Sequence, residues 1–198
     1  FLHGVHGVAT NAPGGQVVSM LIRAGCALFA AHTNADAAAP GVNDALAAVL
    51  GVGDLQVLDP TTPNARTGIG RVGRLPEPEP LVEFAARVAR TLPATHHGVR
   101  CSGAGDSLLA AAAESGADVY VTADLRHHRA LDHLAAGGCA LVDVSHWASE
   151  WPWCEWAAAA LQVSLNAEFP HPATTVGVTV TVSTRPTDPW TGHVRSPR

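Results

Sequence analysis

The hydrophobic positions in the first part of the chain predict two helices that are each followed by strands. Apolar residues at helical spacing that stop at Gly25 predict a helix over 16–24, and the apolar run at 26–31 predicts a short buried strand. A second helix is predicted over 43–50, and two short strands follow it, at 56–58 and 68–75.

Three prolines at 76, 78 and 80 form a stiff connector, which we interpret as the boundary between two lobes. Beyond it, apolar strands and amphipathic helices alternate: helix 81–92, strand 99–102, helix 107–115, strand 118–122, helix 129–136, strand 139–144, helix 156–165 and strand 175–184. Helices of this length between apolar strands favour an α/β fold with parallel strand pairs. Such folds bind their ligands at the carboxyl ends of strands.

Composition and charge exclude two classes of partner. The formal net charge is -5, lysine is absent, and the arginines are scattered singly, so no basic stripe is available for nucleic acid. No apolar stretch reaches the length of about 18 residues that spans a bilayer, and no signal-peptide pattern opens the chain. We therefore expect a soluble, cytoplasmic protein that binds neither nucleic acid nor membranes.

The four cysteines, at 26, 101, 139 and 154, are widely spaced and form no C-x-x-C pair. We interpret them as buried, reduced thiols, which favours a cytoplasmic protein. Disulfide bonds and metal ligation are the alternatives.

A short pattern recurs in the two halves of the chain. The sequence Gly-Cys-Ala-Leu at 25–28 precedes His32 and, four residues later, Asp36. The same four residues at 138–141 precede His146 and, again four residues later, Glu150. The recurrence predicts two related lobes whose strand ends approach each other across one cleft. Coincidence in an alanine-rich chain is the alternative.

Histidine nitrogens and carboxylate oxygens together suit zinc, manganese, iron or cobalt. In a helix, the spacing of four residues would place His146 and Glu150 on one face. Proline is best tolerated in a first helical turn, so Pro152 predicts that the helix begins near Ser149, with His146 in the preceding loop. The pair is therefore interpreted either as two metal ligands or as a helix-capping arrangement.

Other candidates lie on loops. Asp124 and its neighbours follow a predicted strand and could line the same cleft, although Asp124 could equally cap a solvated helix. The loop 103–106 could hold a phosphate with its backbone amides, but it lacks the lysine of a Walker motif. Four further histidines are expected to be exposed: His96, His97, His171 and His193. The sequence contains no G-x-S-x-G motif, so it gives no indication of a covalent nucleophile.

Four segments resemble, in order, the Nif-three-like dinuclear metal centre family, whose members are often named GTP cyclohydrolase I type 2 homologues. They are Ala31-His-Thr-Asn-Ala-Asp36, Gly105-Asp-Ser107, Ala117 to Asp124 with His128, and Val142 to Glu150. The resemblance runs from Phe1 to about Trp190.

The resemblance implies two intertwined α/β lobes with mixed sheets flanked by helices, and a pair of divalent cations in the cleft between them. Residues 1–76 would form the first lobe, 77–145 the second, and 146–198 a segment that returns to the first. It also implies a hexameric ring. The family's metal ligands correspond to Asp36, His146 and Glu150, and its cleft-lining positions correspond to His32, Thr122, Asp124 and His128.

The sequence departs from the family pattern at its start. Phe1 is not an initiator and the single methionine is Met20, so we expect that residues preceding Phe1 are missing. The family's upstream His-His pair is absent with them. With three of the ligands, the chain is expected to hold at most one cation, weakly, unless His3 or His6 substitutes. Ala123 and Ser145 replace two usual glycines, and the inserted domain of some members is absent.

Two functions follow from this resemblance. In the first, a metal pair activates water for hydrolysis of a nucleotide-like or phosphorylated substrate. In the second, the protein is a non-catalytic metal-binding scaffold or a regulatory partner. No residue pattern indicates a guanine pocket.

Overall fold

The computed structural model describes residues 4–101, 107–168 and 178–194 and divides the chain into two compact units, Phe1–Asp36 and Ala37–Arg198. The two predicted lobes, with a boundary at the proline connector, stay a prediction.

The first unit contains one long helix, α1 (Pro13–Ala24), which begins with a proline and ends at Gly25. Gly25 has a φ of 62°, and its amide and that of Cys26 bond the last carbonyls of the helix, which confirms the predicted helix end. The strand expected at 26–31 is wrong, because this segment is extended without a strand partner among the described residues. Leu28 and Phe29 are 54% and 84% exposed. The short helix α2 (Thr33–Ala37) follows.

The second unit begins with helix α3 (Val42–Val49) and an antiparallel hairpin of β1 (Gly53–Pro60) and β2 (Gly68–Arg74). Asp44 in the first turn of α3 accepts hydrogen bonds from Arg71 of β2 through both carboxylate oxygens, each at 2.8 Å. The Arg71 side chain is only 4% exposed, so this ion pair ties the helix to the hairpin. Helix and both strands were predicted from the sequence.

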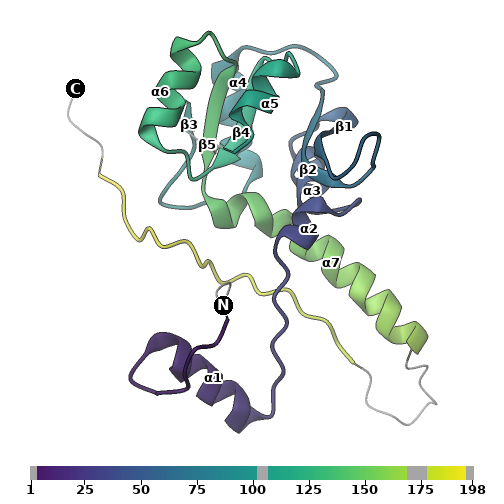
Figure 1. The fold of residues 1–198 in the computed structure, drawn as a ribbon, viewed down its shortest axis with the longest axis vertical. Coiled ribbons are helices and arrows are strands. Elements are labelled where there is room, and N and C mark those ends of the chain that lie inside the picture. The colour runs from purple at the N-terminus through teal and green to yellow at the C-terminus, as the bar shows by residue number, and fades with distance from the viewer. Residues whose placement is uncertain (1–3, 102–106, 169–177, 195–198) are drawn as a thin grey trace. The chain divides into compact units, whose positions relative to one another are not determined.

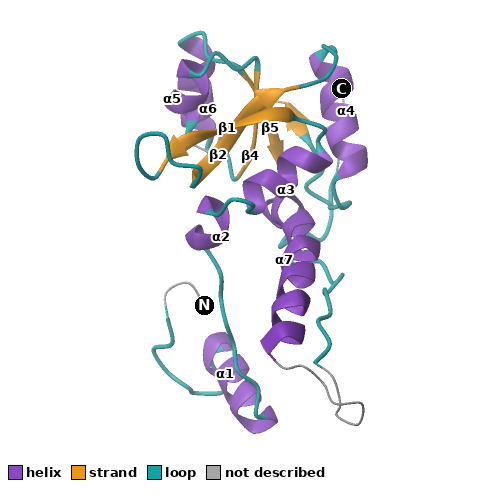
Figure 2. Cartoon of the chain, turned by 90° about the vertical axis from the view of Figure 1, so that its right-hand side faces the viewer, coloured by secondary structure: helices purple, strands orange, loops and turns teal. Residues whose placement is uncertain are grey.

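The centre of the rest of this unit is a mixed sheet of three strands in the order β3-β5-β4. Strands β4 (Val119–Ala123) and β5 (Ala140–Val144) are parallel, whereas β3 (Arg100–Cys101) is antiparallel to β5. Helix α4 (Leu81–Thr91) covers one face, and α5 (Leu109–Glu114) and α6 (His127–Ala135) cover the other (Figures 1 and 2). The predicted α/β fold is therefore confirmed.

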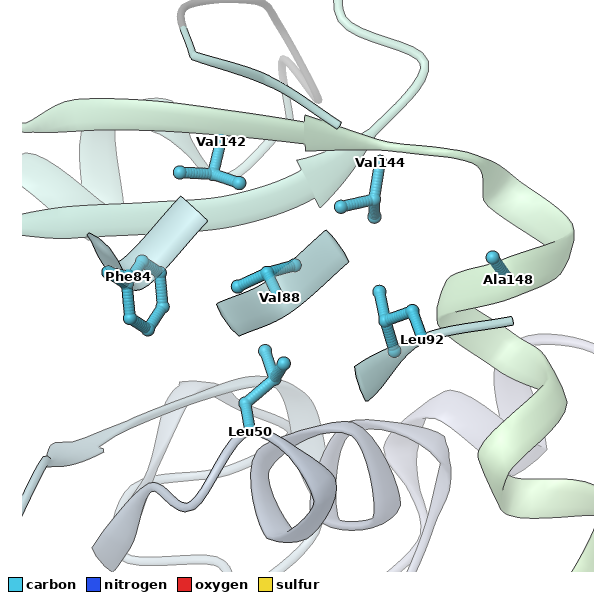
Figure 3. Close-up of a cluster of buried hydrophobic side chains, with 7 residues drawn as sticks. All are labelled: Leu50, Phe84, Val88, Leu92, Val142, Val144 and Ala148. Carbon is cyan, nitrogen blue, oxygen red and sulfur yellow. The ribbon is translucent and has the colours of Figure 1, made fainter. Parts of the chain in front are cut away.

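The core lies between the sheet and α4. Figure 3 shows its seven buried members: Leu50, Phe84, Val88, Leu92, Val142, Val144 and Ala148. Val88 and Val142 are fully buried, with no exposed surface. Leu50 comes from the end of α3 and Ala148 from the last helix, so the core joins segments on both sides of the proline connector. On the other face of the sheet, a smaller cluster contains Leu109, Ala130 and Leu141.

The last helix, α7 (His146–Glu168), begins directly after β5, and Pro152 lies inside it. The expected start near Ser149 is wrong. Ser145 explains the earlier start, because its carbonyl accepts the Ser149 amide at 3.0 Å and its hydroxyl lies 3.5 Å from the Ala148 amide. Pro152 removes only the hydrogen bond to the Ala148 carbonyl, and the helix continues beyond it.

The final predicted strand is also wrong over the residues that are described, 178–184, where the chain is extended but joins no sheet. Side chains of α7 take the place of a neighbouring strand. The Gln162 amide accepts the Val180 N–H and donates to the Val178 carbonyl, and the Trp151 indole donates to the Ser183 carbonyl, each at 3.0 Å. These three bonds hold the segment along α7.

Candidate metal centre

The parallel pairing of β4 and β5 brings two candidate residues together. Ala123 and Val144, the last residues of the two strands, are register partners, so the residues that follow them lie at the same edge of the sheet. There, Asp124 Oδ2 lies 2.6 Å from His146 Nδ1. The role of Asp124 as a residue that lines a metal cleft stays a prediction. Asp124 does not cap α6, whose N-cap is Arg126.

The early start of α7 completes the cluster. Because His146 and Glu150 both lie on this helix, four residues apart, Glu150 Oε1 reaches His146 Nε2 at 2.9 Å. The imidazole therefore lies between two carboxylates, one at each ring nitrogen. The three side chains are open to solvent, with 74%, 60% and 50% of Asp124, His146 and Glu150 exposed.

The two carboxylates change the protonation of the histidine. The hydrogen bond to Glu150 raises the pKa of His146 most, burial opposes it, and Asp124 adds to the increase, which brings the pKa to about 9. At neutral pH both ring nitrogens then carry a proton and donate to a carboxylate. A cation that binds Nε2 has to displace the proton on that nitrogen.

The geometry at Nε2 fits two ligands of one cation. Two donors with bonds of about 2.1 Å to one cation lie about 3 Å apart at the right angles of an octahedral site and about 3.4 Å apart at the tetrahedral angle of zinc. His146 Nε2 and Glu150 Oε1, which form a hydrogen bond at 2.9 Å without a cation, are close to the octahedral separation and need to move apart slightly for zinc. Asp124 at the other ring nitrogen has the position of a carboxylate that orients a metal-binding histidine.

The cluster supplies two donors on one side of the ring. Because Asp124 lies at the opposite nitrogen, it does not add a third, and no group of three or more His, Cys, Asp or Glu side chains among the described residues could hold a metal ion. Asp36 and His32 belong to the unit Phe1–Asp36, whereas the cluster belongs to Ala37–Arg198. Shared coordination by Asp36, and the predicted approach of 26–31 to β5, stay predictions.

The other candidates have local partners. His32 Nδ1 lies 2.9 Å from the Thr33 hydroxyl, and the His32 amide donates to the Asn34 side chain. Thr122 forms a side-chain hydrogen bond with Tyr120. Burial raises the pKa of Tyr120, and this effect outweighs the decrease caused by the bond to Thr122. His128 is exposed at the start of α6, in edge contact with the ring of His127, and in the described part of the chain no hydrogen bond joins it to Asp124 or His146.

A buried pair beneath the cluster was missed from the sequence. His97 Nε2 lies 3.0 Å from Asp143 Oδ2, and only 12% and 8% of the two side chains are exposed. Asp143 Oδ1 accepts the Leu125 amide at 3.4 Å, next to Asp124, whose φ of 58° is left-handed. Asp143 therefore supports the turn that presents Asp124. The expected exposure of His97 is wrong. The sequence signal for this pair was Asp143, an acidic residue inside an apolar strand.

Asp188, in the C-terminal segment, approaches the same region. Burial raises its pKa, but the Ser145 hydroxyl, the Trp190 amide, the Thr95 hydroxyl and nearby His97 together hold the pKa below its ordinary value. Ser145 directly precedes His146. The sequence carries no signal for this contact, because it depends on how the segment after α7 returns.

Several predictions fall outside the described residues: the phosphate loop at 103–106, His3 and His171. Of the cysteines, Cys26, Cys139 and Cys154 form no disulfide, as predicted, and the side chain of Cys101 is not described. Cys26 is exposed, so its predicted burial is wrong. Within the described residues, no helix is long and apolar enough to cross a membrane.

Comparison with known proteins decides the family. Residues 1–189 match the profile of Duf34/NIF3 (NGG1p interacting factor 3). The chain belongs to the NIF3 family. This result confirms the resemblance seen in the sequence motifs.

The relatives of this NIF3-family chain agree. A Streptomyces coelicolor protein named GTP cyclohydrolase 1 type 2 homolog is 42% identical over 99% of the chain and 72% of its own length. A Mycobacterium bovis protein of the same name is 33% identical over 96% of the chain and 79% of its own length. A Bacillus cereus protein related to NIF3 has the same fold, with a TM-score of 0.81, 21% identity and coverage of 95% of this chain and 79% of its own.

Proposed function

We propose that this NIF3-family chain is part of a dinuclear-metal hydrolase that acts on a nucleotide-like or phosphorylated substrate. The observation that carries the proposal is the placement of His146 Nε2 and Glu150 Oε1 at 2.9 Å, with Asp124 at the second ring nitrogen. A nucleotide-like substrate is supported by the relatives' name, GTP cyclohydrolase 1 type 2 homolog.

Each residue would have a distinct role. His146 and Glu150 would hold a divalent cation, zinc, manganese, iron or cobalt, together with Asp36. Asp124 would keep the imidazole oriented by accepting a hydrogen bond from the Nδ1–H group. The bound cations would supply a water molecule of lowered pKa. His32, Thr122 and His128 would line the surrounding cleft.

We also propose that a cytoplasmic hexameric ring is the working assembly. The alternative function is a metal-binding scaffold or regulatory partner without turnover. The observation that favours it is the arrangement of the cluster, in which the described residues offer one cation only two donors.

Metal titration by calorimetry tests the site. Chelator-treated protein is titrated with Zn²⁺ and with Mn²⁺. We expect that His146→Ala abolishes measurable binding and that Asp124→Asn weakens it by roughly 10- to 100-fold, the usual effect of losing an orienting partner. His193→Ala, at an exposed histidine outside the cluster, is the matched control and should bind as the wild type does. Unchanged binding by His146→Ala would contradict the proposal.

Turnover separates the two functions. The metal-loaded protein is incubated with GTP and with a panel of phosphorylated substrates. Steady turnover that a chelator and His146→Ala both abolish supports the hydrolase. Stoichiometric metal without turnover of any tested substrate supports the scaffold.

A further inference from the structure

A concave site that contains none of the His146 cluster lies in the unit Ala37–Arg198. It is a cavity of about 580 Å³, within the range of small-molecule sites. The walls come from the segment before α3, from α3 itself, from the β1-β2 hairpin and from α7. The lining residues that matter are Pro40, Asp44, Leu55, Arg66 and Trp156.

The cavity is separate from the candidate metal centre. None of the three cluster residues lines it. On α7, Trp156 follows Glu150 by six residues, which corresponds to about 9 Å along the helix axis and a rotation of about 240°. The two side chains therefore leave the helix on different faces.

The cavity has one charged side chain whose charge is not balanced, and that charge is positive. Asp44 lines it, but both of its carboxylate oxygens accept hydrogen bonds from Arg71, and Oδ2 also accepts the Gly41 amide. Arg66 is exposed, and within residues 4–101, 107–168 and 178–194 no ion pair or hydrogen bond engages its guanidinium. The Arg66 guanidinium is thus left without a counter-charge in a wall that is mostly apolar.

We propose that this cavity binds a small organic anion with a planar aromatic ring. Such a ring would pack against the Trp156 indole and the aliphatic wall of Pro40 and Leu55, and its carboxylate or phosphate would accept paired hydrogen bonds from Arg66. The ring gives the ligand its apolar contact area, and the guanidinium selects for the anion. This site is independent of the proposed hydrolase activity.

Equilibrium dialysis with a matched pair of probes tests the site. The probes are 2-naphthoate, an aromatic carboxylate, and 2-naphthamide, the uncharged amide of the same ring. EDTA is present throughout, so that no bound cation recruits the carboxylate. We expect one saturable 2-naphthoate site and roughly tenfold weaker binding of 2-naphthamide, the scale of a charge-assisted hydrogen bond at a solvent-accessible position.

The variants separate the roles of charge and ring. Arg66→Gln should weaken 2-naphthoate binding about tenfold and leave 2-naphthamide unchanged, whereas Arg66→Lys should retain part of the preference for the anion. Arg74→Gln, at an exposed arginine at the end of β2 that does not line the cavity, is the control. Trp156→Ala should weaken both probes. Equal affinity of the two probes, no saturable binding, or wild-type behaviour of Arg66→Gln would overturn the proposal.

Discussion

The same four residues, Gly-Cys-Ala-Leu, adopt two different structures in this chain. At 138–141 they lead into β5, where Leu141 is 1% exposed between the sheet and its helices. At 25–28 they end α1 at the left-handed Gly25 and continue outside any sheet, where Leu28 is 54% exposed. Over these four residues the two segments are identical, so the difference arises from the residues that follow them and from their neighbours in the fold.

The comparison shows that an apolar segment forms a strand only where a neighbouring strand can pair with it. β5 lies between β3 and β4, and its amide and carbonyl groups bond to both neighbours. Among the described residues, no strand pairs with 26–31. An apolar run reports only that a segment is suited to burial, and a partner is needed before it forms a ladder.

The largest expected difference concerns the two leucines of the repeat. Leu141→Ala should lower the free energy of unfolding by about 3 kcal/mol, because it removes buried methyl groups and leaves a cavity. Leu28→Ala should cost less than about 1 kcal/mol, because that side chain is already half in water. Urea unfolding midpoints compare the two variants. Equal losses would show that the segment at 26–31 is buried in solution.

A smaller loss of stability is expected at Asp143, the acidic residue of β5 that has no counterpart in 26–31. Asp143→Ala should cost about 2 kcal/mol, because it leaves His97 and the Leu125 amide without their acceptor. Asp118→Ala, at an exposed acid just before β4, is the control and should cost less than about 0.5 kcal/mol. Thermal unfolding measures both, and a neutral Asp143→Ala would refute the supporting role of this pair.

The smallest effect concerns the cysteines of the repeat. Burial raises the pKa of Cys139, which lowers its reactive thiolate fraction at pH 8, whereas Cys26 is exposed. We expect Cys26 to react with iodoacetamide several-fold faster than Cys139, with the rates followed by mass spectrometry of the peptides. Faster alkylation of Cys139 would reverse the comparison.

The sequence predicted most of the second unit, because its strands and helices follow one another in regular alternation and pack locally. It failed at both segments that lack strand partners, 26–31 and 178–184. In the second of these, Gln162 binds the backbone groups that a strand would have paired, and no periodicity in the sequence reveals such a contact. The start of α7 that was predicted from Pro152 was also too late, because Ser145 caps the helix earlier in the chain.

At the candidate site, the family resemblance named His146 and Glu150 as metal ligands and Asp124 as a residue that lines the cleft. The parallel pairing of β4 and β5 explains why Asp124 and His146 meet. The contacts that support these residues could be predicted only in part, because Asp143 inside an apolar strand indicates a buried acid but does not identify its partner. The contact of His97 with Asp143 joins residues 46 positions apart, and that of Asp188 with Ser145 depends on the path of the C-terminal segment.

The central claim is that His146 binds a cation through Nε2 while Asp124 holds the proton on Nδ1. Two-dimensional ¹H–¹⁵N spectra of the histidine side chains, recorded before and after addition of Zn²⁺, test it directly, with His146→Ala used to assign the signals. We predict that Nε2 of His146 changes from a protonated to a metal-bound nitrogen and that Nδ1 stays protonated. A His146 ring that does not respond to Zn²⁺, or one that binds through Nδ1, would contradict the account.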